Sequence, residues 1–143
     1  MTSIKRSALV SFSDAEMFAL VKDVERYPEF MPGAQKATLL GEGDDWMEAQ
    51  LQLGKGKISQ TFTTYNNLNP PHTMELTLVE GPFKTFHGLW TFTPLAERAC
   101  KVELHLEFEF SNKLVAMAAG KLFEAMANQQ VEAICKRAKQ IYQ

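Results

Sequence analysis

Hydrophobic and polar residues alternate with a period of two along most of the chain, which is the pattern of half-buried β-strands. The alternation begins over residues 2–11, where Ile4, Ala8 and Val10 occupy even positions. It returns in six further runs, which short segments rich in Gly, Pro, Asn and Asp separate. These runs lie at residues 35–40, 46–53, 57–65, 73–80, 84–93 and 100–110. Because the links are short, we predict one antiparallel sheet of seven strands.

Two other stretches follow helical spacing. Residues 13–16 read Ser-Asp-Ala-Glu, a capping box that predicts a short helix, and Pro28 and Pro32 limit the next segment to about one further turn. From Asn112 to Gln143 there is no proline, and one side of a long amphipathic helix is apolar. That side holds Val115, Ala119, Leu122, Met126, Ala133, Ile134 and Ile141. The expected order is β-α-α-β-β-β-β-β-β-α, an α+β fold in a single domain over residues 1–143.

These elements predict an apolar gap inside the molecule. Seven strands span roughly 30 Å, whereas one helix with its side chains is only about 10–12 Å wide. We therefore expect the sheet to curl around the long helix and to leave a cavity, closed at one end by the connector over residues 27–32. The alternation and the connector direct these side chains at it: Tyr27, Phe30, Leu51, Phe62, Met74, Leu76, Leu78, Phe86, Trp90, Phe92, Leu106, Phe108, Leu122 and Met126. A filled core requires the same residue types.

A few residues interrupt these apolar stripes. Gly88 stands between Phe86 and Trp90, where it indicates a bend in the sheet, a bulge or room for a ligand. Polar side chains also stand where the stripes are otherwise apolar, at Gln60, Gln129 and Gln130. They either face solvent or bind the polar head group of a ligand.

Composition places the chain among soluble globular proteins. It has 143 residues, of which 45% are hydrophobic and 22% charged, with a formal net charge of -2. These values exclude a disordered tail and a general nucleic-acid coat. Without an export signal or an apolar stretch of membrane-spanning length, we expect a cytoplasmic protein. Cys100 and Cys135 form no CxxC motif and have no histidine at metal-ligand spacing, so they predict neither a metal site nor a disulfide framework.

The sequence favours binding over catalysis. No nucleophile elbow, zinc-binding His pair or phosphate-binding loop is present. His72 lies in a turn, and His87 and His105 occupy the polar parity of their strands, so all three are expected to face solvent. We predict no catalytic residue, no metal and no required cofactor.

Cations are distributed unevenly. The C-terminal helix carries Lys113 and Lys121, and the turn between two predicted strands carries Lys55 and Lys57. The helix lysines predict a local excess of positive charge on a chain that is acidic overall, and Lys55 and Lys57 predict a second basic spot together with Lys5, Arg6 and Lys36. Whether the two groups join into one face is left open by the sequence.

Four segments carry a family resemblance, in the order in which they occur here: residues 24–32 (VERYPEFMP), 78–84 (LVEGPFK), 88–95 (GLWTFTPL) and 108–114 (FEFSNKL). Together they resemble the family of bacterial RatA proteins and mitochondrial coenzyme Q-binding proteins, in the polyketide cyclase/dehydrase-like branch of the START (helix-grip) superfamily. The resemblance extends over nearly the whole chain. It departs at Gly33-Ala34, where many relatives have a cysteine.

The resemblance implies a helix-grip fold and two alternative functions. The first is a non-catalytic protein that holds a ubiquinone-like isoprenoid or another lipid in its cavity, supports respiratory electron transfer and contacts the membrane only peripherally. The second is a ribosome association toxin that binds the large (50S) ribosomal subunit and blocks 70S formation. In this second case Lys55, Lys57, Lys113 and Lys121 are the expected ribosome-facing residues.

Overall fold

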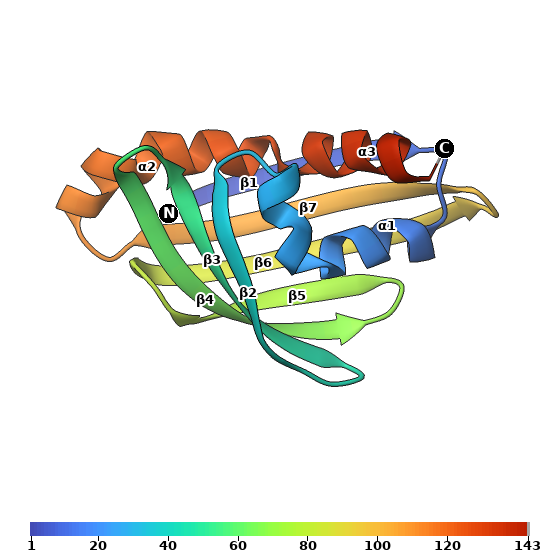
Figure 1. The fold of residues 1–143 in the computed structure, drawn as a ribbon, viewed down its shortest axis with the longest axis horizontal. Helices are drawn as coiled ribbons and strands as arrows, with labels where there is room; N and C mark the ends of the chain where they lie inside the picture. The colour runs from blue at the N-terminus through green and yellow to red at the C-terminus, as the bar shows by residue number, and fades with distance from the viewer. Residues whose placement is uncertain (143) are drawn as a thin grey trace.

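The computed structural model describes residues 1–142 and contains one curved, seven-stranded antiparallel sheet with helices along one side of it (Figure 1). The strands are β1 (Thr2–Val10), β2 (Ala34–Glu42), β3 (Trp46–Lys55), β4 (Ile58–Asn69), β5 (Thr73–Glu80), β6 (Phe83–Ala96) and β7 (Ala99–Phe110). The helices are α1 (Asp14–Lys22), the 3-10 helix η1 (Val24–Glu29), α2 (Lys113–Asn128) and α3 (Gln130–Ile141).

The sheet has the order β1-β7-β6-β5-β4-β3-β2. Strands β2 to β7 form the predicted meander, and β1 pairs with β7 at one edge. The helix-grip architecture expected from the sequence is confirmed. One strand boundary is clearly different, because β4 continues to Asn69 where the prediction ended at residue 65. Asn66 was predicted to be a turn residue, but it pairs with Met47 of β3 on one side and with Leu76 of β5 on the other.

The connection from β1 to β2 forms as the capping residues predict. The Ser13 hydroxyl accepts a hydrogen bond from the Glu16 amide at 3.1 Å, and the Glu16 carboxylate accepts one from the Ser13 amide at 3.0 Å. Two of the amides that lack a helical partner at the start of α1 are thereby paired. After α1 the chain makes only η1, with Pro28 inside it, before β2 begins.

The C-terminal helix is not continuous, contrary to the prediction. Asn112 caps α2 as expected, accepting a hydrogen bond from the Val115 amide at 2.9 Å. At Gln129 the helix is interrupted, because the Gln129 amide bonds to the Met126 carbonyl, three residues back, rather than four. The side chain of Asn128 donates to the Glu124 carbonyl at this point, a local bond that competes with the helical ladder. Gln143, the predicted helix end, lies outside the described residues.

The core lies between the sheet and helices α1, α2 and α3. Strand β7 shows the predicted alternation, with Cys100, Val102, Leu104, Leu106 and Phe108 buried. The buried side of α2 and α3 is shifted from the prediction. It consists of Ala119, Phe123, Met126, Ala127, Val131, Ile134 and Ala138, whereas Ile141 is 47% exposed.

Candidate functional site

A cavity lies in the interior, between the sheet and the junction of α2 and α3. Eight of the residues predicted to face a ligand line it: Tyr27, Leu51, Phe62, Met74, Leu76, Phe86, Trp90 and Leu106. The remaining lining residues were not in that predicted set: Val24, Ala49, Leu53, Thr64, Asn66, Phe123 and Gln130. The topology therefore gathers side chains from η1, the five central strands β3 to β7 and both C-terminal helices.

The cavity is much smaller than the sequence led us to expect. Its volume is about 40 Å³, whereas ligand pockets usually measure about 300–1,000 Å³. The expected roomy gap is thus a wrong prediction in this conformation. The comparison of strand and helix widths neglected side-chain volume, and aromatic rings fill most of the space.

Phe123 is the centre of this filling. Its ring lies 4.9 Å from that of Phe108 and 5.2 Å from that of Phe83, measured between ring centroids. Phe62 and Phe110 complete the group at 6.1 and 5.8 Å. Edge-to-face pairs at these separations stabilise a core beyond simple burial. Phe123 was missed because the predicted apolar side of the helix ran through Leu122 instead.

The other predicted ligand residues lie away from the cavity. Phe92 and Phe108 are fully buried in aromatic packing. Leu122 and Met126 line a separate void of about 10 Å³ under the β3–β4 hairpin, and Phe30 lies in a surface groove. Leu78 is half-buried beside Gly81. Ligand contact by any of these residues remains a prediction.

The three glutamines and Gly88 now have definite places. Gln130 lines the internal cavity, Gln60 lines the small void, and Gln129 is exposed. A Cβ at Gly88 would lie 2.7 Å from the Leu106 side chain and 3.0 Å from that of Leu76. Gly88 therefore permits close packing and provides no room for a ligand.

Asn66 is a buried polar group that the sequence analysis missed. It is 2% exposed, and its Oδ1 accepts a hydrogen bond from the Thr64 hydroxyl at 2.8 Å. Its Nδ2 contacts the sulfur of Met74 at 3.8 Å. The signal was present in the sequence, because Phe62, Thr64, Asn66 and Leu68 continue one alternating face of β4.

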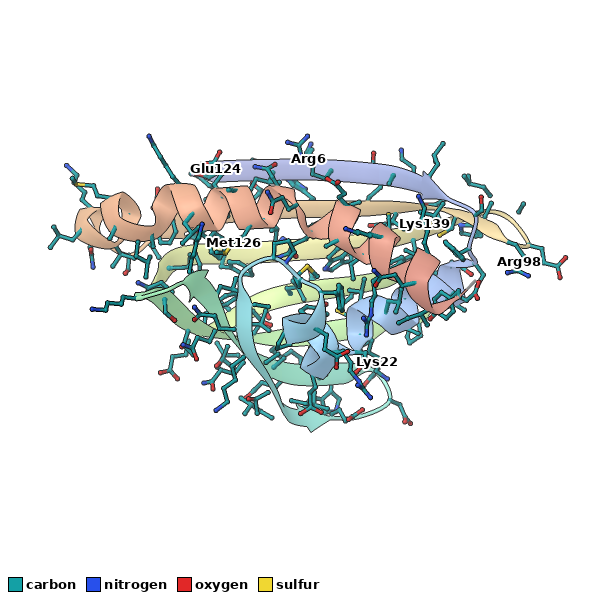
Figure 2. The ribbon with its side chains drawn as sticks, turned by 45° about the horizontal axis from the view of Figure 1, so that its top comes forward. Arg6, Lys22, Arg98, Glu124, Met126 and Lys139 are labelled. Carbon is teal, nitrogen blue, oxygen red and sulfur yellow. The ribbon has the colours of Figure 1, made fainter. Side chains whose placement is uncertain are left out.

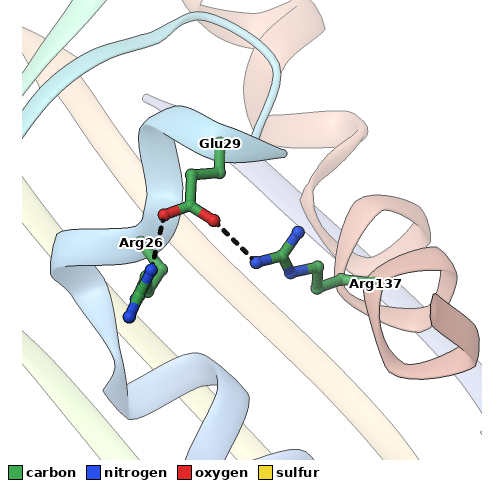
Figure 3. Close-up of polar contacts among 3 residues, drawn as sticks. All are labelled: Arg26, Glu29 and Arg137. Atoms are coloured by element: carbon green, nitrogen blue, oxygen red, sulfur yellow. Dashed lines mark hydrogen bonds and ion pairs between the residues drawn. The ribbon is translucent and has the colours of Figure 1, made fainter. Parts of the chain in front are cut away.

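An ion-pair cluster joins η1 to α3 near the Gln129 break (Figure 3). The Glu29 carboxylate accepts hydrogen bonds from Arg26 at 3.0 Å and from Arg137 at 2.8 Å. These two bonds hold the pKa of Glu29 below its usual value, with that from Arg26 the larger cause. The Arg137 guanidinium also lies 5.0 Å from the centre of the Phe30 ring, a cation–π contact.

Replacing Glu29 tests this cluster. For Glu29→Gln we expect a melting temperature lower by on the order of 2 °C at pH 7, since exposed ion pairs contribute little. A carboxyl with a lowered folded pKa stabilises above its unfolded pKa, so the difference should shrink as the pH falls below about 4. Thermal unfolding from pH 3 to 7 measures it. Glu25→Gln is the control, because Glu25 forms no ion pair within residues 1–142. A difference that is independent of pH would contradict the assignment.

The four lysines of interest lie at one end of the molecule. Gly54 and Ile58 of the β3–β4 hairpin line the same small void as Ala119 and Leu122 of α2, so the hairpin packs beside that helix (Figure 1). Lys55, Lys57, Lys113 and Lys121 are exposed, and within the described chain none of them forms an ion pair.

Exposed apolar side chains accompany these lysines. Leu114 and Met117 of α2 are 79% and 83% exposed, and Ile58 of the hairpin is 47% exposed. We call the four lysines and these three residues the hairpin–α2 surface. A cationic surface with protruding apolar side chains can bind a polyanionic partner and also displace water from it.

Groups that could perform covalent chemistry are poorly placed for it. Burial raises the pKa of the Cys100 thiol to about 11 and also raises that of Cys135, so neither is a ready nucleophile. His87 pairs with Glu75 at 2.9 Å and His105 with Glu107 at 3.5 Å, both on the solvent side of the sheet. Among residues 1–142 there is no His, Cys, Asp and Glu grouping that could hold a metal ion. Over the same range, no helix is long and apolar enough to cross a membrane.

Comparison with known proteins gives matches along almost the whole chain. Residues 10–135 match the family described as polyketide cyclase/dehydrase and lipid transport. The ribosome association toxin RatA of Vibrio cholerae is 51% identical over 142 residues, which cover 99% of each chain. The mitochondrial coenzyme Q-binding protein COQ10 of Drosophila melanogaster is 23% identical, over 94% of this chain and 57% of its own.

Among solved structures, the Zhui aromatase/cyclase from Streptomyces superposes with a TM-score of 0.83 at 17% identity. The match covers 99% of this chain and 96% of that enzyme. At this identity the likeness establishes the fold alone.

Proposed function

The chain belongs to the polyketide cyclase/dehydrase and lipid transport family, and from this premise we propose that it associates with the ribosome as a non-catalytic toxin. The observation that carries the proposal is the 51% identity, over 99% of both chains, to a protein named ribosome association toxin. In this proposal the protein binds the large ribosomal subunit and interferes with the joining of the two subunits.

The small internal cavity supports this choice over quinone binding. A space of about 40 Å³ holds no more than one or a few water molecules. The coenzyme Q-binding relatives are also more distant, and the chain spans just over half the length of the one described above. Holding a quinone or another lipid therefore stays a prediction from the resemblance.

The hairpin–α2 surface supplies the contact in this proposal. Ribosomal RNA presents closely spaced phosphates, and each lysine that neutralises one releases a bound counterion. The four lysines are free of competing carboxylates within the described part of the chain, so they need not break an ion pair to bind. The proposal places the protein where ribosomes are, in the cytoplasm.

Sedimentation with ribosomal subunits tests the proposal. We expect the purified protein to co-sediment with the large subunit at 50 mM salt and to reduce the 70S peak when both subunits are mixed. Between 50 and 200 mM salt, four phosphate contacts should weaken binding by about 100-fold. Bovine serum albumin at equal concentration serves as the control. Failure to co-sediment with either subunit at low salt would contradict the proposal.

A second measurement examines the quinone prediction separately. Protein purified from its host is extracted with organic solvent, and the extract is analysed by mass spectrometry. With the interior filled as described, we expect less than about 0.1 mol of quinone per mol of protein, because binding would first require displacement of packed side chains. A stoichiometric amount would show that the interior opens.

A further inference from the structure

Strand β1 forms a regular and open edge of the sheet. Its nine residues pair one to one with β7, from Thr2 with Phe108 to Val10 with Cys100, without a register shift. Within residues 1–142, no other backbone or side-chain group bonds to the backbone of β1. The amides and carbonyls that point away from β7 are therefore available to another strand.

The opposite edge of the sheet is different. Strand β2 has two register shifts against β3, between Ala34 and Lys36 and between Leu39 and Gly41. Such bulges twist an edge and hinder the addition of a further strand. The 3-10 helix η1 also packs against β2. Only one of the two edges is thus geometrically suited to strand addition.

A cleft of about 860 Å³ lies between β1 and α3, which also contact one another, and the Arg6 side chain donates a hydrogen bond across it to Asn128 at 2.9 Å. Residues 6–12 form one wall and residues of α3 form the other (Figure 2, where Arg6 and Lys139 mark the two walls). The apolar part of the lining comes from Ala8, Val10, Phe12, Val131 and Cys135, whereas the Leu9 side chain, opposite Lys101, lies on the solvent side of the sheet. A strand added to β1 would place every second side chain into this cleft.

Charge distinguishes between two candidate partners for this edge, a second copy of the chain and an acidic strand of another protein. Lys5 and Arg6 stand at the middle of β1, and Lys139 lines the cleft, whereas Glu132 is its one acidic lining residue. Two copies paired antiparallel through β1 would bring their central Lys5–Arg6 segments together, and facing like charges destabilise a strand pair. An acidic strand would instead find complementary charge.

We propose that the β1 edge and its cleft bind an extended segment of a partner protein in which acidic and apolar residues alternate. The segment adds an eighth strand to the sheet, with its backbone bonded to β1 and its apolar side chains in the cleft. This surface shares no residue with the hairpin–α2 surface, so it does not depend on the proposed ribosome binding.

A peptide that copies residues 101–110 (KVELHLEFEF) is a suitable probe. It has the required alternation, and the same sequence already pairs with the inner edge of β1 in the fold. Fluorescein-labelled peptide is titrated with the full chain, and anisotropy gives the Kd. Two further peptides carry N-methyl groups on alternate residues, in the two opposite phases.

Strand addition predicts an asymmetric result. One N-methylated phase should weaken binding about tenfold or more, because its methyl groups face β1 and remove the amide donors. The other phase should bind within about twofold of the unmodified peptide, since its methyl groups face solvent. Equal affinities for both phases, or no binding of the unmodified peptide, would overturn the proposal. These peptide titrations use the unmodified protein.

Two variants examine the charge argument. Arg6→Glu should weaken binding of the acidic peptide about fivefold, whereas Lys36→Glu makes the same charge change on the other edge, β2, and should leave the Kd unchanged. Equal effects of the two variants would overturn the proposal. Sedimentation equilibrium of the chain alone completes the test. A dimer that the peptide dissociates would show that a second copy occupies the edge, and would also overturn it.

Discussion

Reversing all four lysines of the hairpin–α2 surface, with Lys55→Glu, Lys57→Glu, Lys113→Glu and Lys121→Glu, is expected to abolish ribosome association. Each reversal removes one phosphate contact and adds a repulsive charge, so the affinity at 50 mM salt should fall by 100-fold or more, on the order expected for four contacts. All four side chains are exposed, so the melting temperature should change little. Co-sedimentation with the large subunit measures the loss.

The control for this experiment has the same net charge. A second variant reverses four other exposed lysines, Lys5, Lys36, Lys136 and Lys139. It should retain most of the binding, because these lysines lie outside the hairpin–α2 surface. If both variants lose binding equally, then net charge governs association and the surface is wrongly assigned.

Truncating Phe123 to alanine should have the largest effect on stability. The ring is 7% exposed and lies against four other phenylalanine rings, so its removal leaves a large void in the filled interior. We expect Phe123→Ala to lower the free energy of unfolding by about 3–5 kcal/mol. Urea denaturation followed by circular dichroism measures it.

Leu114→Ala is the matched control on the same helix. Leu114 is 79% exposed, and its truncation should change the free energy of unfolding by less than about 0.5 kcal/mol. A cost below about 1 kcal/mol for Phe123→Ala would mean that the interior is loosely packed. Such an interior could open to admit a quinone despite the small cavity.

Local patterns in the sequence were sufficient to predict the sheet. Strand β7 alternates without interruption, and its buried residues are those on the predicted face. The Ser13–Glu16 capping box and the Asn112 cap are likewise decided by residues within one turn. Such features depend on short-range sterics and hydrogen bonds, which the sequence displays directly.

Features that depend on tertiary packing were missed. Asn66 has the residue type of a turn, but its pairing with Met47 of β3 and Leu76 of β5 makes it part of a strand. The helix break at Gln129 involves Asn128, whose side chain bonds to Arg6 of β1 at 2.9 Å, a contact between residues far apart in the chain. The cavity volume depends on how the phenylalanine rings around Phe123 interdigitate, which periodicity does not describe.

The candidate surface was predictable only in part. The sequence indicates which lysines are exposed, because a turn and a helix face are local features. That the β3–β4 hairpin lies against α2 follows from the curvature of the sheet. The exposed Leu114 and Met117 were hidden in a helix of generally apolar composition.

The interruption at Gln129 gives the two C-terminal helices separate anchors. Phe123 fixes α2 in the aromatic core, whereas Arg137 and the Tyr142 hydroxyl, which donates to the Glu16 carbonyl at 2.9 Å, fix α3 to η1 and α1. Detachment of α3 would uncover Gln130 while the lysines of α2 kept their positions. Movement of α3 alone would therefore leave the hairpin–α2 surface in place.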